Sequence, residues 1–174
     1  MAYADVLELN RRQPRRLYEA PLTNNGRQTA PLTGAASFLA YLGAAPLLAA
    51  ALVLIADPFE AAAEAFLVLY GAALLIFFGG VRWGVAVMKP AGPTTRALIG
   101  AGLPMFAALP LFAPGDANLK MIAIMGLMLV LLIDDLNATR RGDGAPAWYL
   151  GVRIPLTVLI EVAFLVALAA GMRG

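Results

Sequence analysis

Few side chains in this sequence have types that suit chemistry, and two of them stand out because apolar residues surround them. Glu161 lies inside a long apolar stretch, and Arg82 lies near the end of another. A charge in such a stretch is costly unless it is paired, hydrated or neutralised, so each marks a functional-site hypothesis. Glu161 either forms an interhelical ion pair with Arg82 or Arg153, or stays protonated and serves as a proton relay or ligand contact.

The missing residue types exclude much of the known site chemistry. The chain contains no cysteine and no histidine. The sequence therefore excludes disulfides, zinc sites with these ligands, histidine-ligated haem, and Ser-His-Asp or Cys-His catalysis. No glycine-rich phosphate loop or nucleophile elbow is present. We predict no metal, no cofactor and no enzymatic activity.

A glycine-rich run surrounds Arg82 and Trp83 at residues 77–84, with the sequence FFGGVRWG. Glycines such as Gly80 permit another backbone or a flat ligand to approach closely. The guanidinium offers a planar set of donors to a carboxylate or phosphate, and tryptophan suits the membrane–water interface. The run indicates either helix-end packing with an interfacial anchor, or a niche for a lipid headgroup, a quinone or a partner helix.

Two further charged groups lie outside the apolar stretches. Asp134 and Asp135 precede Arg140 and Arg141, which predicts a solvated loop that neutralises itself. The polar segment 1–34 carries a basic run at Arg11, Arg12, Arg15 and Arg16. Such an arm either attracts anionic lipid or docks onto a partner subunit.

Composition and hydropathy set the fold class. Hydrophobic residues make up 61% of the 174 residues and charged residues only 14%, against about 25% charged in soluble domains. Five apolar stretches cover residues 35–56, 65–81 (continuing to 88), 97–113, 117–133 and 154–172. These lengths predict an all-α membrane bundle of five transmembrane helices over residues 35–174. The third and fourth stretches form either two spans or a re-entrant hairpin, and Pro104 and Pro110 should bend the third or break it into two pieces.

Basic residues alternate between the two sides of this predicted bundle. With five spans, one side collects eleven lysines and arginines and the other collects two. The richer side should be cytoplasmic. The N-terminus is thus expected inside and the C-terminus in the periplasm. Stripes of small residues at 36/40/44, 80/84 and 163/167/171 predict close helix packing, either within the bundle or against another subunit.

Three motifs together carry a resemblance to a known family. They are YLGAAPL at 41–47, FGGVRWG at 78–84 and PAWYLGVRIPLT at 146–157. They resemble a family of small, uncharacterised proteobacterial inner-membrane proteins with mitochondrial relatives, over about residues 38–172. In the third motif, Trp148 and Tyr149 suit an anchor at headgroup depth, and Arg153 should snorkel or pair where the last helix begins.

Two functional hypotheses follow. The first is an accessory or assembly subunit of a larger respiratory or photosynthetic membrane complex in the bacterial inner membrane, with other integral membrane subunits as partners. The second is a small proton-coupled transporter, or a protein that binds phospholipid or quinone through Glu161 and Arg82. Nucleic acid is not expected as a partner. The candidate site residues are Gly80, Arg82, Trp83, Trp148, Tyr149, Arg153 and Glu161.

Overall fold

Five α-helices and a short 3₁₀ helix make up the part of the chain that the structure, a computed structural model, describes: residues 29–90, 92–142 and 144–172. The elements are α2 (Thr29–Ala56), α3 (Ala61–Val87), α4 (Thr95–Ala108), η2 (Leu109–Phe112), α5 (Ala117–Arg140) and α6 (Ala147–Gly171). The basic run at Arg11, Arg12, Arg15 and Arg16 lies outside the described residues. Residues Thr33–Gly174 cluster as one unit.

Side-chain caps define where three of the helices begin. Glu60, Thr94 and Asp116 accept hydrogen bonds from backbone N–H groups in the first turns of α3, α4 and α5. A capping oxygen satisfies donors that the first helical turn leaves without partners. Pro146 occupies the equivalent position before α6. As a result α6 begins at Ala147, seven residues before the apolar stretch from which we predicted it.

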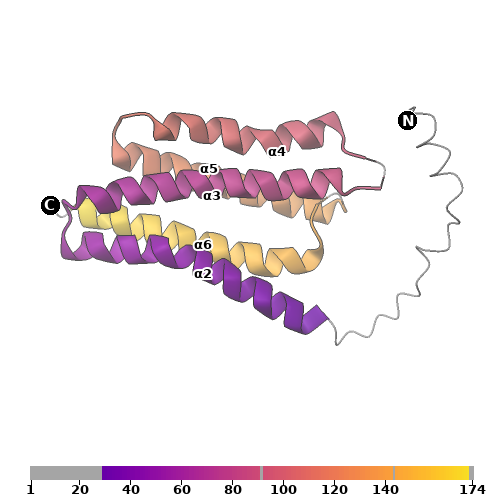
Figure 1. Cartoon of the computed structure of the whole chain (residues 1–174), viewed down its shortest axis with the longest axis horizontal. Coiled ribbons are helices and arrows are strands. Elements are labelled where there is room, and N and C mark those ends of the chain that lie inside the picture. The colour runs from indigo at the N-terminus through magenta and orange to yellow at the C-terminus, as the bar shows by residue number, and fades with distance from the viewer. Residues whose placement is uncertain (1–28, 91, 143, 173–174) are drawn as a thin grey trace, which may run out of the picture. The chain divides into compact units, whose positions relative to one another are not determined.

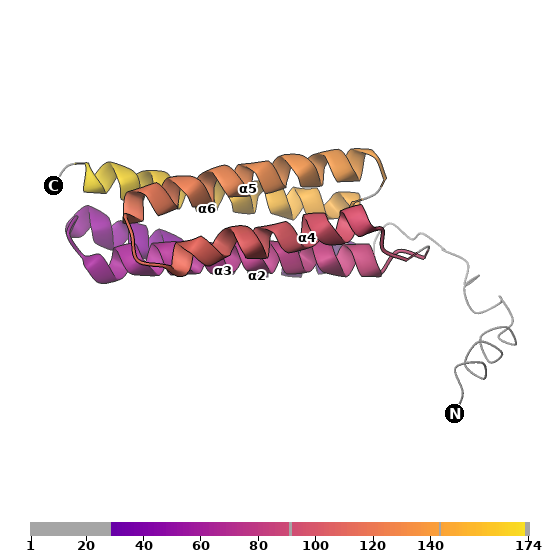
Figure 2. The same cartoon turned by 90° about the horizontal axis from the view of Figure 1, so that it is seen from above.

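The helices confirm an all-α membrane bundle. Four of the described segments are long and apolar enough to cross a membrane: Gly34–Ala56, Ala61–Val87, Thr95–Phe112 and Trp148–Gly171. The fifth helix, α5, falls outside this set. Its uncharged stretch between Lys120 and Asp134 has thirteen residues, about 20 Å of helix. Helices α4 and α5 run antiparallel along the bundle (Figures 1 and 2), so residues 97–133 form two helices, of which α4 with η2 is long enough to cross a membrane.

The third apolar stretch is interrupted where the prolines predicted a bend. Pro104 lies inside α4, which ends at Ala108. The chain then tightens into η2, with Pro110 in its first turn. A proline lacks the backbone donor that the α-helical pattern needs, so the helix changes its pitch there. This change lets α4 and η2 together reach 18 residues before the turn into α5.

Helix α3 holds the bundle together through small residues and one hydrogen bond. An added Cβ at Gly71 would lie 2.6 Å from Phe164 on α6, and one at Gly79 would lie 2.8 Å from the carbonyl oxygen of Ala101 on α4. The Tyr70 hydroxyl donates to a backbone carbonyl of α2 over 2.8 Å. The stripe predicted at 80/84 is wrong as a packing surface within the bundle, because an added Cβ at either glycine would meet nothing within 4 Å.

Candidate functional site

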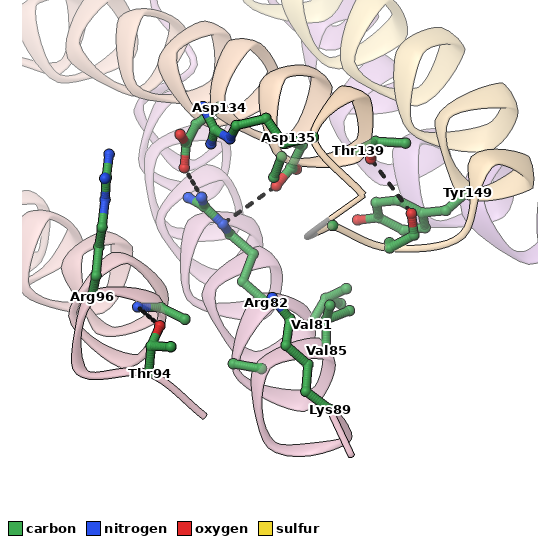
Figure 3. Close-up of a pocket in the computed structure, with 16 residues that line it drawn as sticks. Val81, Arg82, Val85, Lys89, Thr94, Arg96, Asp134, Asp135, Thr139 and Tyr149 are labelled. Atoms are coloured by element: carbon green, nitrogen blue, oxygen red, sulfur yellow. Dashed lines mark hydrogen bonds and ion pairs between the residues drawn. The ribbon is translucent and has the colours of Figure 1, made fainter. Parts of the chain in front are cut away.

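Four charged side chains form an ionic cluster at the end of the bundle where α3 and α5 finish and α6 begins. The cluster consists of Arg82, Asp134, Asp135 and Arg153. Arg82 contacts both carboxylates: its Nη2 donates to Asp134, and its Nε lies 3.3 Å from Oδ1 of Asp135 (Figure 3). Asp135 also accepts a hydrogen bond from Nε of Arg153 at 3.4 Å. One carboxylate therefore bridges two arginines from different helices.

Arg153 is the most enclosed member of the ionic cluster. Its side chain is fully buried. The guanidinium lies over the ring of Phe78 on α3, 3.4 Å from the ring centroid, which adds a cation–π attraction to the ion pair. Its two terminal nitrogens have no hydrogen-bond partner among the described residues. We expected this arginine to snorkel or pair at the start of the helix; it pairs, but inside the bundle.

The positions of Asp134 and Asp135 differ from those predicted from the sequence. We expected Asp134 and Asp135 to lie in a solvated loop with Arg140 and Arg141, but both belong to α5, which continues to Arg140. Asp134 is half exposed, whereas Asp135 is only 11% exposed. Their partner is Arg82, because the C-terminal ends of α3 and α5 lie side by side at one end of the bundle (Figure 3).

The predicted pairing of Glu161 with Arg82 or Arg153 is also wrong. Both arginines bind Asp135, and Oε1 of Glu161 is buried with no hydrogen-bond partner in the described structure. Glu161 follows Arg153 by eight residues on α6, about 12 Å along the helix axis. The structure therefore separates Glu161 from the ionic cluster.

A pocket of about 380 Å³ opens beside the ionic cluster. It lies between the end of α3, the start of α4, the end of α5 and the connection into α6 (Figure 3). Its polar and aromatic lining consists of Arg82, Lys89, Thr94, Arg96, Asp134, Asp135, Thr139, Arg141 and Tyr149. Its apolar wall comes from Val81, Val85, Ala86, Ala97, Ala138 and Ala145. Polar groups thus share the pocket with an apolar surface.

The charges around this pocket favour an anion. Four basic and two acidic side chains line it. Arg82 and Arg153 pair with the two carboxylates, so the four charges of the ionic cluster neutralise one another. Arg96 and Arg141 are exposed at the rim and add positive charge. The arrangement can hold a phosphate or carboxylate at the rim, with an apolar portion against the alanines and valines.

The predicted aromatic residues divide between pocket and surface. Tyr149 lines the pocket, and its ring packs edge-to-face against Trp148 with centroids 6.3 Å apart. Trp83 and Trp148 are half exposed, and Gly80 is also exposed. None of these three lines the pocket. Exposed tryptophans near helix ends are typical of the membrane–water interface. Because Trp83 and Trp148 are the sequence neighbours of the pocket residues Arg82 and Tyr149, we expect the pocket at headgroup depth.

Comparisons with known proteins identify a family. The sequence profile of a family described as "Protein of unknown function (DUF3429)" matches residues 32–169. The chain belongs to this family. Its membership confirms the resemblance to uncharacterised membrane proteins that the three motifs indicated, and all three motifs lie inside the matched range.

A vertebrate relative shares the same region in part. The chain is 36% identical over 97 residues to "Transmembrane protein 69" of Xenopus tropicalis. The aligned region covers 53% of this chain and 36% of that protein, so the chain spans about a third of its relative's length. No solved structure matches the chain. The relative's name agrees with a multi-helix protein embedded in a membrane.

Several lining residues were not among the predicted site residues, namely Lys89, Thr94, Arg96 and Arg141, of which Arg141 was expected only in a solvated loop. The predicted topology could have indicated these residues. With five alternating spans, the connections around residues 89–96 and 134–153 fall on the same side of the membrane as Arg82. Carboxylates and arginines on one side of a bundle were therefore available to pair.

Proposed function

We propose that this membrane protein is non-catalytic and binds the anionic headgroup of a phospholipid in the pocket beside the ionic cluster. The observation that carries the proposal is the combination of exposed Arg96 and Arg141 with an apolar wall in one pocket. A phosphodiester joined to acyl chains has both chemistries. A neutral quinone ring would use the apolar wall but would not need the additional positive charge.

The expected topology supports the same ligand. The end of the bundle that carries the pocket is the end that the distribution of lysine and arginine predicts to face the cytoplasm of a bacterial inner membrane. The cytoplasmic leaflet presents anionic headgroups, and each basic residue near its surface contributes about 1 kcal/mol of attraction. A pocket that faces this leaflet meets its ligand without any transport step.

Lipid retention measured by native mass spectrometry tests the proposal. The protein is purified with phosphatidylglycerol and phosphatidylcholine in equal amounts, and the variant Arg96→Gln/Arg141→Gln is compared with wild type. Loss of two rim charges should weaken retention of phosphatidylglycerol by about 2 kcal/mol, roughly 30-fold. The matched control is Arg140→Gln, because Arg140 is exposed but does not line the pocket. Equal loss in control and double variant would contradict a specific pocket.

A second role, that of an accessory or assembly subunit in a larger energy-converting membrane complex, is favoured by a different observation. Glu161 lies in the middle of a span with one oxygen buried and without a partner in the described structure. Glu161 is also partly exposed, so a helix of another subunit that packs on its exposed side would supply a partner for the carboxyl group. Solubilisation in mild detergent at native expression level, followed by a native gel, should show co-migration with a large assembly. A monodisperse single chain would contradict this role.

A further inference from the structure

The outward face of α6 carries a stripe of apolar residues with one carboxyl group among them. Ile154, Val158 and Leu165 are exposed. Glu161 is partly exposed and continues the same stripe, because residues separated by three, four or seven positions share one helix face. We name residues 154, 158, 161 and 165 the outer stripe of α6. In a membrane this stripe faces lipid or another helix.

The depth of Glu161 decides what can reach it. It lies thirteen residues after Trp148 and ten before Gly171, the two ends of the span. These separations correspond to about 20 Å and about 15 Å of helix. A lipid headgroup at either surface of a ~30 Å hydrocarbon layer does not reach this depth. A polar partner for the carboxyl must therefore come from inside the membrane.

The chain's own described residues do not supply that partner. Oε1 of Glu161 is buried inside the bundle without a hydrogen bond, and no described residue forms a hydrogen bond or ion pair with the partly exposed carboxyl group. The nearest cationic side chain on the same helix, Arg153, points into the bundle and binds Asp135. An ionised carboxylate without a partner is unfavourable in the hydrocarbon layer. Glu161 can stay in the membrane as a neutral carboxylic acid, but a hydrogen-bond donor from another helix is needed to make its position favourable.

We propose that the outer stripe of α6 binds a transmembrane helix of another membrane protein, which places a lysine or arginine against Glu161. This inference rests on the proposed subunit role and names the chemistry of the contact. A second copy of the chain fits less well, since a two-fold symmetric contact brings the same patch of each copy together and would oppose one carboxyl with another. Charge complementarity and depth together favour a cationic side chain on a different helix.

A defined probe makes the proposal testable. The full chain, labelled with a fluorescent donor, is reconstituted in phosphatidylcholine vesicles with acceptor-labelled synthetic helices of about 22 leucines and alanines. One helix carries a central lysine, a second a central leucine and a third a central glutamate. Wild type should bind the lysine helix about fivefold more tightly than the leucine helix, since interhelical polar contacts in membranes contribute about 1 kcal/mol.

Three variants locate the effect. Glu161→Leu should lose the preference for the lysine helix, and it removes a polar group from the apolar stripe, so the bundle should still form. Glu161→Lys should instead prefer the glutamate helix. The control Glu64→Gln changes a carboxyl in the first turn of α3 and should leave the preference intact.

Two outcomes would overturn the proposal. The first is equal binding of the lysine and leucine helices by wild type. The second is energy transfer between two labelled copies of the chain that Glu161→Leu abolishes, because the occupant would then be a second copy. If either result is accompanied by co-migration on the native gel, the contact of the outer stripe with a cationic helix is disproved while the subunit role stands. If the protein runs on that gel as a single monodisperse chain, the subunit role itself is disproved.

Discussion

Replacing Asp135 with asparagine should destabilise the bundle far more than the same change at Asp134. Asp135 is 11% exposed and bridges Arg82 and the fully buried Arg153 over 3.3 and 3.4 Å. Removing one partner of a buried ion pair leaves an uncompensated charge and costs about 3–5 kcal/mol. Because Arg82 keeps Asp134, we expect the lower end of this range for Asp135→Asn, about 3 kcal/mol. Asp134 is half exposed, so Asp134→Asn should cost at most about 1 kcal/mol.

Reversible unfolding in mixed micelles with increasing dodecyl sulfate measures both variants. Trp83 and Trp148 belong to the helix segments that carry Arg82 and Arg153. Their fluorescence therefore reports on this end of the bundle, while far-UV circular dichroism reports on the helices as a whole. The free energies of unfolding from the two probes should agree for wild type and Asp134→Asn.

A compensating change separates lost charge from lost packing. The double variant Asp135→Leu/Arg153→Met replaces the buried pair with apolar groups, and such replacements are often neutral or stabilising. It should therefore be more stable than Asp135→Asn alone. Equal losses in the free energy of unfolding for Asp135→Asn and Asp134→Asn would show that the Asp135 bridge does not stabilise the bundle. The same would follow if the double variant were the least stable of the three.

Two further predictions concern packing and topology. Gly79→Ala should destabilise the bundle by about 1–3 kcal/mol, because the new Cβ would lie 2.8 Å from a backbone oxygen of α4. The new Cβ of Gly80→Ala meets nothing within 4 Å, so this variant should be neutral or slightly stabilising. The same micelle titration measures both variants, and equal losses of stability would contradict the packing of α3 against α4. The chain has no cysteine, so single cysteines report topology in intact cells: Phe59→Cys, in the α2–α3 connection, should react with an impermeant maleimide from the periplasm, and Arg140→Cys should react only after lysis. The opposite pattern would reverse the orientation.

Hydropathy alone predicted the helices because membrane helices need long apolar stretches whatever they pack against. The ends of the helices were predicted less well. The apolar stretch at 154–172 missed the first turns of α6, where Trp148, Tyr149 and Arg153 interrupt the hydropathy but continue the helix. The chain continues the helix there because Arg153 finds both a carboxylate and an aromatic face in the bundle, and a one-dimensional pattern does not contain these partners.

The site was only partly predictable for the same reason. Arg82 and Tyr149 were expected and do line the pocket. For Asp135 the sequence predicted a solvated loop, because its neighbours in sequence are charged. In the structure its neighbours are the ends of two other helices. Glu161 was singled out correctly as unusual, but its distance from Arg82 depends on which helix face and which depth each residue occupies. Hydropathy fixes the depth approximately and the face hardly at all.

Photocrosslinking of lipid shows whether the pocket beside the ionic cluster binds phospholipid. Phosphatidylglycerol with a photoactivatable group in the first carbons of an acyl chain is incorporated into vesicles with the full chain, and crosslinked residues are mapped by mass spectrometry. We predict that crosslinks concentrate on the pocket wall, at Val85, Ala97 and Ala138, and that excess unlabelled phosphatidylglycerol removes them. Crosslinks spread evenly over the exposed apolar residues of all helices, unaffected by that competition, would contradict the account.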